Sequence, residues 1–504
     1  MTDEQSVMRI VIVGGGTAGW MSAALLARFA PPGYAITLVE SETIGTVGVG
    51  EATIPAIRLF NDALEIDEGA FLAATKGSFK LGIEFAGWLE DGHSYMHAFG
   101  TVGRQLGVLP FRHFWARGRA LGIAKPLAHY SANELAARTG RMATHARGPG
   151  IPEVPYAYHF DAGLYAAFLR DYAEKRGVER IEATLAGASR TDKGDIAAVM
   201  TNDGRAIAGD FFIDCSGFKG LLIEQELKTG YEDWRHWLPC DRAVAVPCEP
   251  SGNFTPYTRS TARAAGWQWR IPLQHRIGNG HVFCSEYMSE DEASAVLLAN
   301  LDGKPLADPR AIPFVTGRRK RIWNRNVLAV GLSSGFLEPL ESTSIHLIQS
   351  TITRLLTVLP GKQIEPAVVE GFNRRSAAEF ETIRDFLILH YWANQRTGQP
   401  FWDRMRALEL PETLAQRIAE FRAANQIQPA TDELFTEVAW LQVLVGQGLV
   451  AGSWNPIADR YPEEELAAFL GAVEKACIET VRPMPMHIDC VAALCGAAAK
   501  EKAA

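Results

Sequence analysis

The sequence predicts an α/β protein, with a core of mixed strands and helices followed by a mostly helical C-terminal region. Three observations support this fold class. A β-branched apolar run at residues 8–13 leads into a glycine-rich turn and then a helix-like segment. Strand-like runs that end in glycine recur through the middle of the chain. From about Glu365 onward the apolar residues follow helical spacing, and strand signals become scarce.

The composition is that of a chain that buries a large core. Of 504 residues, 47% are hydrophobic and 21% charged, which excludes disorder of the whole chain. The net charge of −8 argues against a dedicated nucleic-acid binder, which would show a basic stripe. No uninterrupted apolar run approaches the ~18 residues that a membrane helix needs. The polar, acidic start MTDEQSVMRI is unlike a signal peptide.

The cysteines point to the same kind of protein. Seven of them form no C-x-x-C pair, which fits a reducing compartment and no structural zinc. His93 and His97 lie four residues apart, but no third ligand stands near them. We therefore expect a cytoplasmic protein with no metal site and no nucleic-acid or membrane partner. Monomer and homodimer both stay open.

The N-terminal elements form a βαβ unit. After the strand at 8–13, residues 18–30 are predicted to form a helix that Pro31 and Pro32 end. A second strand follows at 35–39, and the connection is long enough for a parallel crossover.

The turn between this first strand and helix has the pattern of a dinucleotide site. Gly14 makes the tight turn, Gly16 lets the backbone approach a pyrophosphate, and Gly19 allows close packing of the helix. Thr17 and Ala18 open the helix, whose N-terminus attracts the anion. Glu40 stands 21 residues after Gly19, where a carboxylate holds a ribose hydroxyl. The alternative is a glycine turn in an ordinary α/β domain.

Two later segments favour FAD over NAD. One strand, 210–214, ends at Asp214 and is followed by Cys215-Ser216-Gly217, and another, 326–330, ends at Gly331-Leu332. This is similar to the glutathione-reductase-like and flavin-monooxygenase-like folds, in which three separated segments hold FAD. The chain has one GxGxxG pattern, so we expect the flavin to be reduced elsewhere and to arrive as FADH2.

Residues 266–272 form an unusual G-W-x-W-x-I-P segment. Trp267 and Trp269 stand at positions i and i+2, and in a strand they would point to the same side. Two such rings could be core filler. Together with the FAD pattern, however, the segment resembles the flavin-dependent halogenases, of which the tryptophan halogenases are best known.

Three more segments carry the resemblance, which runs from about residue 8 to about residue 402. Residues 48–55 are similar to the flavin strap of the family, with Val49, Gly50, Glu51 and Ala52 at the cofactor. Lys80, in Ser78-Phe79-Lys80, is placed as the catalytic lysine of the family is. Residues 338–343 are similar to its glutamate–serine segment. The resemblance implies a core at 1–390, with inserted substrate-facing segments at about 90–160, and a helical region at 391–504 that covers the substrate.

The resemblance also implies a chemistry. Reduced FAD, oxygen and halide give hypohalous acid, which moves through a tunnel to an aromatic substrate. Lys80 presents the halogen, as a hydrogen-bond donor or as a haloamine, and the residues alone leave both modes open. Glu341, with Ser342 beside it, polarises the oxidant or deprotonates the arene. Trp267, Trp269, Ile271 and Pro272 separate substrate from flavin. A separate NAD(P)H-dependent flavin reductase supplies the FADH2.

The sequence departs from the family pattern at two places. Ser344 stands where the best-known members have glycine, next to the backbone of Thr343 and Ser344 that would hold the halide. Bromide, which is larger and easier to oxidise than chloride, is therefore a credible preferred halide. In the segment that corresponds to the family's substrate lid, residues 433–461, Trp440 and Trp454 are the candidate substrate contacts, and the family's paired tyrosines are not found. An indole or another electron-rich aromatic fits better than free tryptophan.

Two other functions compete with halogenation. A flavin-dependent aromatic hydroxylase would have the same cofactor fold but would transfer oxygen directly. A non-catalytic FAD-binding protein would keep the fold alone. The two-tryptophan segment and the Lys80 and Glu341 pair count against both. The basic run at 317–321 is expected to be a solvated turn.

Overall fold

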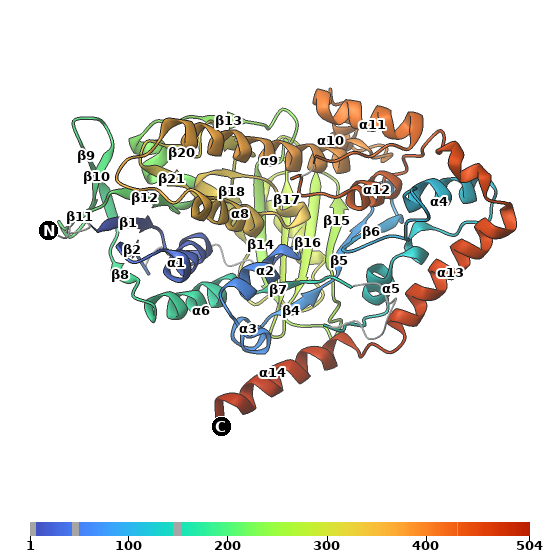
Figure 1. The fold of residues 1–504 in the computed structure, drawn as a ribbon, viewed down its shortest axis with the longest axis horizontal. Helices are drawn as coiled ribbons and strands as arrows, with labels where there is room; N and C mark the ends of the chain where they lie inside the picture. The colour runs from blue at the N-terminus through green and yellow to red at the C-terminus, as the bar shows by residue number, and fades with distance from the viewer. Residues whose placement is uncertain (1–6, 43–49, 145–153, 431, 504) are drawn as a thin grey trace. The chain divides into compact units, whose positions relative to one another are not determined.

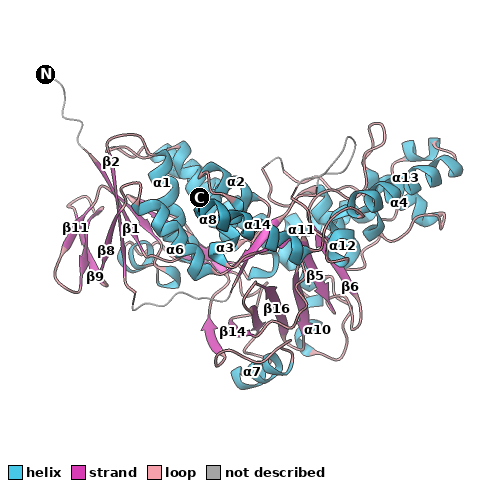
Figure 2. Cartoon of the chain, turned by 90° about the horizontal axis from the view of Figure 1, so that it is seen from below, coloured by secondary structure: helices cyan, strands magenta, loops and turns pink. Residues whose placement is uncertain are grey.

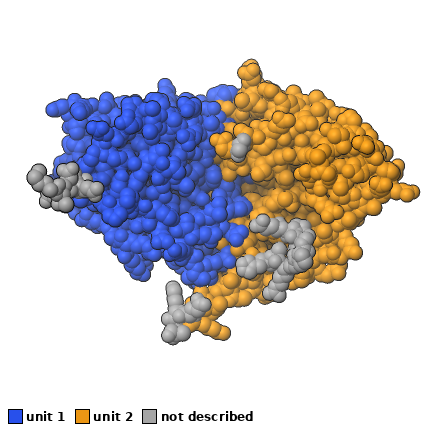
Figure 3. Space-filling view, viewed as in Figure 1, with its two compact units in different colours: residues 1–77, 160–239, 313–381 blue, residues 78–159, 240–312, 382–504 orange. Residues whose placement is uncertain are grey.

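The computed structural model describes residues 7–42, 50–144, 154–430 and 432–503. The chain divides into two compact units (Figure 3). Unit 1 comprises residues 1–77, 160–239 and 313–381, and unit 2 comprises residues 78–159, 240–312 and 382–504. The predicted division at residue 390 does not coincide with these units, because the chain leaves and re-enters each of them. The predicted insertion at about 90–160 falls within one segment of unit 2.

A six-stranded sheet forms the centre of unit 1. Its strands, in spatial order, are β20 (Trp323–Asn324), β21 (Val327–Ala329), β12 (Phe211–Asp214), β1 (Met8–Val13), β2 (Tyr34–Glu40) and β8 (Glu179–Glu182). All neighbours run parallel except β20 and β21. β1 is buried along nearly its whole length, as expected for a parallel strand covered on both faces. The strands predicted from apolar runs are confirmed to within a few residues at each end.

Helices pack against this sheet and against one another. They are α1 (Thr17–Phe29), α2 (Ala56–Ala63), α3 (Glu68–Thr75), α6 (Ala162–Glu174) and α8 (Ser344–Thr357), with α1 beside α6 and α8 (Figures 1 and 2). α1 ends where the prediction placed its end, since Ala30 before two prolines is extended. Two small sheets complete the unit: β9 (Leu185–Arg190), β10 (Ile196–Thr201) and β11 (Ala206–Ala208); and β13 (Tyr231–Asp233), β19 (Gly317–Arg319) and β22 (Gly335–Phe336).

The basic run at 317–321 is not the solvated turn that the sequence suggested. Arg318 and Arg319 lie in β19 and are more than nine-tenths buried. Arg319 Nη1 pairs with Glu224 Oε2 at 2.7 Å, and Arg318 Nη2 pairs with Glu232 and Glu381, each at 3.0 Å. Carboxylates from segments distant in sequence compensate these charges, and the local sequence pattern does not predict these partners.

Unit 2 is built on a seven-stranded sheet. Its strands, in spatial order, are β18 (Arg310–Pro313), β14 (Arg242–Cys248), β17 (Ile277–Phe283), β16 (Gly266–Pro272), β15 (Thr258–Arg263), β5 (Gly82–Ala86) and β6 (Ser94–Ala98). β15 and β5 run parallel, whereas β14, β17, β16 and β15 alternate in direction. Every residue of β16 and β17 is buried. The short strand β4 (Ser78–Lys80) pairs with β7 (Ala157–Phe160) outside this sheet.

The predicted helical C-terminal region is present. It consists of the end of α9 (Pro366–Trp392), then α10 (Pro400–Arg406), α11 (Glu412–Ala424), α12 (Glu437–Gly446), α13 (Glu463–Val481) and α14 (His487–Ala503) (Figure 1). Earlier in unit 2 lie α4 (Phe111–Ala120), α5 (Ala132–Arg138) and α7 (Glu290–Ala299). α4 and α13 share an apolar core that includes Phe114 and Phe469. Among the described helices, none combines the length and the hydropathy that crossing a membrane requires.

Candidate active site

Three loops meet at one edge of the unit 1 sheet. β2, β1, β12 and β21 are successive parallel neighbours, so their carboxyl ends share that edge. The loops that follow β1, β12 and β21 carry residues 14–19, 214–217 and 330–332. Ligands of open parallel sheets bind at this position. The topology therefore brings together the three segments in which the sequence predicted cofactor contacts.

The glycines of these loops are needed where they stand. A Cβ added to Gly19 would lie 1.9 Å from the Gly14 carbonyl oxygen, and one on Gly14 would lie 2.4 Å from the carbonyl oxygen of Cys215. A Cβ on Gly331 would lie 2.8 Å from the Ala18 methyl carbon. Gly14 and Gly331 also have positive φ, 109° and 71°. The close approach therefore draws all three loops around the start of α1.

The start of α1 fits the phosphates of a dinucleotide. Gly16 is the N-cap and has no side chain to bond the first backbone N–H groups of the helix. Residues 14–18 keep part of their surface exposed although β1 before them is buried. Uncapped N–H groups and the positive end of the helix dipole attract an anion. The loops thus provide the cradle that FAD requires.

Glu40 and Asp214, the acidic residues at the ends of β2 and β12, differ in their hydrogen bonds. Glu40, at the end of β2, accepts a hydrogen bond from Arg180 Nε at 2.6 Å, and its other oxygen, Oε2, lies against Gly15. That position keeps an acceptor at the glycine turn, as the prediction of a ribose contact requires. Asp214 instead accepts from Ser216 N, Ser216 Oγ, Leu222 N and Ile223 N.

Both oxygens of Asp214 are therefore used within the protein, and the side chain is fully buried. Its carboxylate organises the loop after β12. Of the predicted strap, Gly50 has a φ of 79°, and Glu51 and Ala52 form the short strand β3. Burial raises the pKa of Glu51 to about 7. Val49 lies outside the described residues.

The glutamate–serine segment leads into α8 in unit 1. Pro339–Glu341 form one 3₁₀ turn, Ser342 takes a left-handed conformation with φ 61°, and Thr343 is the N-cap of α8. Residues 341–343 are buried. The Thr343 side chain does not cap the helix, and its Oγ1 is buried without a hydrogen-bond partner among the described residues. The positive helix end and this hydroxyl together suit a small anion.

Ser344 begins α8 as its first residue. It is half-buried and follows the buried Thr343. Its side chain therefore adds an oxygen at the place where the predicted halide contacts lie.

Lys80 lies in unit 2 and is fully buried. It is the last residue of the short strand β4. Its Nζ lies 5.4 Å from the centroid of the Phe99 ring, an arrangement that favours a cation. A lysine that reaches the interior of a protein is costly unless its charge or its amine is used.

The two tryptophans of β16 occupy the same face, as the strand period requires. The ring centroids of Trp267 and Trp269 are 6.0 Å apart, and Trp88 lies 6.4 Å from Trp267. Trp269 covers Gly280 of β17, where an added Cβ would lie 2.1 Å from the ring. Its Nε1 is buried and has no hydrogen-bond partner among the residues described. Trp267, Trp269 and the buried Ile271 lie on one face of β16 and form an apolar wall in unit 2, whereas the buried Pro272 points to the opposite face.

The predicted substrate tryptophans are engaged in packing. Trp440 in α12 is 1% exposed. Its Nε1 donates to Glu433 at 2.9 Å, and the Arg417 guanidinium lies 4.1 Å from its ring centroid. Trp454 donates to Asp459 at 2.8 Å and packs on the core shared by α4 and α13. Both have the contacts of structural residues.

A buried polar network behind Lys80 was not predicted. Ser78 Oγ donates to the Pro272 carbonyl at 2.7 Å and lies 3.0 Å from His159 Nδ1. His159 Nε2 lies 2.9 Å from Thr258 Oγ1. Burial, with the charges of Lys80 and Arg270 nearby, lowers the pKa of His159 well below its usual value. The sequence shows no motif for this network, because its members come from four separate strands, β4, β7, β15 and β16.

Comparison with known proteins gives a consistent result. The chain matches the sequence pattern of the tryptophan halogenase family over residues 9–463. It is 35% identical over 474 residues to a tryptophan 6-halogenase of Streptomyces toxytricini, covering 88% of this chain and 90% of that protein. It is 33% identical over 502 residues to a tryptophan 7-halogenase of Lentzea aerocolonigenes, covering 92% and 94%.

Solved structures of the same kind superpose closely. A flavin-dependent halogenase from Xanthomonas campestris has a TM-score of 0.94 and 46% identity, over 97% of this chain and 98% of that one. BrvH, a flavin-dependent halogenase from a Brevundimonas species, has a TM-score of 0.93 and 42% identity, over 97% and 100%.

Proposed function

This chain belongs to the tryptophan halogenase family of FADH2-dependent oxidoreductases, and we propose that it halogenates an indole or a similar electron-rich aromatic through Lys80. Halide and oxygen are co-substrates, and a separate flavin reductase supplies the reduced cofactor. When bound, reduced FAD with oxygen supplies the two-electron oxidation of the halide. The observation that carries the role of Lys80 is its complete burial at the end of β4.

The residues of unit 1 bind the cofactor and the halide in this proposal. Gly16–Gly19 hold the pyrophosphate on the N-terminus of α1, and Glu40 holds a ribose hydroxyl. Thr343 and Ser344 hold the halide through backbone N–H groups, and the buried Oγ1 of Thr343 adds a donor. The extra side chain at Ser344 changes the room for the ion, which favours bromide over chloride.

Lys80 holds the oxidised halogen beside the aromatic ring to be substituted. As an ammonium it can donate three hydrogen bonds, and as a free amine it can accept the halogen covalently. Glu341 accepts the proton that leaves the ring after substitution. The tryptophan wall of β16 keeps the substrate away from the cofactor, which supports halogenation over direct hydroxylation.

The substrate is the least constrained part of the proposal. Trp440 is buried and its Nε1 is bonded to Glu433, while the Nε1 of the half-buried Trp454 is bonded to Asp459, so both indole N–H groups are already used within the protein. We therefore propose an indole that lacks the free amino-acid group, or one carried by a larger molecule.

The proposal is tested with FAD, a flavin reductase, NADH and oxygen, with chloride and bromide offered in parallel. Indole and free tryptophan serve as acceptors, products are weighed by mass spectrometry, and catalase removes free peroxide. Lys80→Met, which keeps the length of the side chain but loses the amine, is the control. We expect a halogen isotope doublet that disappears in the variant. A product heavier by one oxygen and formed without halide would establish a hydroxylase instead.

A further inference from the structure

Strand β4 has one edge with no neighbouring strand among the described residues. β4 pairs with β7 on one side only and is the last strand of its sheet. An edge strand exposes backbone N–H groups that must find partners when they are buried. Phe79 and Leu81, which flank Lys80, are both fully buried.

Two different groups meet that edge. The backbone N–H of Leu81 donates to the carbonyl oxygen of Pro256 at 2.8 Å. The backbone N–H of Phe79 donates to His487 Nε2 at 3.0 Å. The N–H of Phe79, before Lys80, is thus held by the first residue of α14, and the N–H of Leu81, after it, is held by the segment before β15.

His487 acts as a bridge between these segments. Since Nε2 accepts from Phe79, the ring proton must be on Nδ1, which lies 3.0 Å from the carbonyl oxygen of Phe254 and donates to it. The imidazole also stacks on the Phe254 ring, with centroids 4.5 Å apart and planes at 11°. Burial lowers its pKa to about 4, so the ring is neutral at pH 7 and Nε2 keeps its lone pair.

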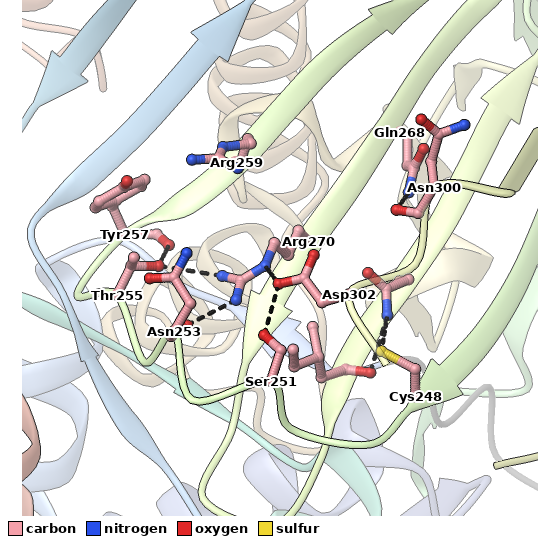
Figure 4. A network of polar contacts seen from close by, with 12 residues as sticks. Cys248, Ser251, Asn253, Thr255, Tyr257, Arg259, Gln268, Arg270, Asn300 and Asp302 are labelled. Atoms are coloured by element: carbon pink, nitrogen blue, oxygen red, sulfur yellow. Dashed lines mark hydrogen bonds and ion pairs between the residues drawn. The ribbon is translucent and has the colours of Figure 1, made fainter. Parts of the chain in front are cut away.

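The loop that carries Phe254 is itself fixed by a buried cation (Figure 4). Arg270 of β16 donates to Asp302 Oδ2 at 2.7 Å, to the Asn253 carbonyl at 2.7 Å and to Thr255 Oγ1 at 3.2 Å. Phe254 therefore sits between two anchored residues. The start of α14 is held as well, because the backbone N–H of His487 donates to the Gly140 carbonyl at 2.8 Å.

We propose that His487 is a positioning residue for halogenation, which sets the backbone of β4 so that Lys80 is aimed at the substrate. The contacts run from the loop at residues 253–255, through the imidazole of His487, to the backbone N–H of Phe79, one residue before Lys80. The inference rests on the proposed function of Lys80. It adds a residue from the C-terminal helix, separated from the lysine by some four hundred positions, to the reaction.

The two ring nitrogens of His487 allow a matched pair of variants. In His487→Asn the amide takes the place of Nδ1, so the bond to Phe254 can persist while Phe79 loses its acceptor. In His487→Gln the amide oxygen reaches the place of Nε2 and can still accept from Phe79. Both variants lose the stacked ring. His281→Asn is a further control, because His281 is buried, bonds the Ala293 carbonyl and lies in β17, whose strand partners are β14 and β16.

The first readout is the yield of halogenated product per FADH2 oxidised, with a freely diffusing halogen acceptor to trap escaping hypohalous acid. Displacement of a reacting group by ~1 Å costs on the order of 10²-fold. We therefore expect His487→Asn to lose roughly tenfold or more in yield, with trapped oxidant rising in step. His487→Gln should stay within about twofold, and flavin binding should be unchanged in both. The second readout is deuterium uptake by the peptide that contains residues 78–81, which needs no cofactor. It should rise in the Asn variant only.

Equal yields of product from His487→Asn and His487→Gln would overturn the inference and leave the role of Lys80 intact. The same conclusion would follow if His281→Asn lost product yield in proportion to its loss in Tm, because the loss would then reflect stability alone. Normal product from Lys80→Met would refute the proposed function, and the inference with it. If His487→Asn fails to fold, His487→Gln alone decides. Its amide oxygen can still accept from Phe79, so deuterium uptake at residues 78–81 that is higher in this variant than in the wild type would refute the bridging contact.

Discussion

Replacement of Asp214 tests how the FAD cradle is held together. Its carboxylate accepts from Leu222 N and Ile223 N, both at 2.8 Å, and from Ser216 N at 3.0 Å. Hydrogen bonds to a charged group contribute about 1.5–3 kcal/mol each, and a buried N–H left unpaired costs about 1–3 kcal/mol. In Asp214→Ala the two buried amides alone therefore cost about 3–6 kcal/mol. Total stability is about 5–15 kcal/mol, so this is a large fraction of it.

Asp214→Asn separates the parts of this effect. The amide oxygen can still accept from Leu222 and Ile223, and the amide nitrogen can turn to Ser216 Oγ. Only the bond from Ser216 N and the charge are lost, so we expect a loss of about 2 kcal/mol. Urea unfolding measures the free energy, and quenching of flavin fluorescence measures FAD affinity, which should fall in the order wild type, Asn, Ala. An Ala variant within ~1 kcal/mol of the wild type would refute the reasoning.

Three further predictions follow from the structure. Burial lowers the pKa of His281 and of His487 to about 4, below the unfolded value of 6.5. As the pH falls, these histidines therefore take up protons in the unfolded chain before they do so in the folded chain, and the free energy of unfolding should fall between about pH 6.5 and pH 4 by up to ~3 kcal/mol for each. Urea titration at several pH values measures this free energy. A flat profile would contradict this. Gly280→Ala should displace the Trp269 ring and reduce halogenated product per FADH2 at least several-fold, whereas unchanged coupling would show that the wall tolerates movement. Ser342→Gly should keep or raise Tm, since a φ of 61° suits glycine, while Ser342→Ala keeps the Cβ and gains no such relief; product from both variants equal to that of the wild type would exclude a role for the hydroxyl.

Local patterns were enough for much of the fold and the cofactor cradle. The apolar run at 8–13 and the two prolines after α1 each act within a few residues, and the strand and helix predicted from them are confirmed by β1 and α1. The i, i+2 spacing of Trp267 and Trp269 likewise predicts a shared face, because a strand has a period of two. The helical C-terminal region follows from apolar spacing in the same way.

Other features depend on residues that the sequence keeps far apart. Arg318 and Arg319 look like a solvated run until carboxylates from other segments bury them. Asp214 has the position of a cofactor ligand, yet its oxygens are taken by amides of the following turn.

The sequence by itself indicated a dinucleotide cradle, because glycine turns are dictated by backbone sterics over a few residues, and its short motifs indicated the family of reaction through their resemblance to the flavin-dependent halogenases. Only the tertiary structure decided how the chain divides into two discontinuous units and what holds Lys80. The contact of His487 with Phe79 joins positions 408 apart. A buried donor must be paired, but which distant group pairs with it is settled only when the chain has folded.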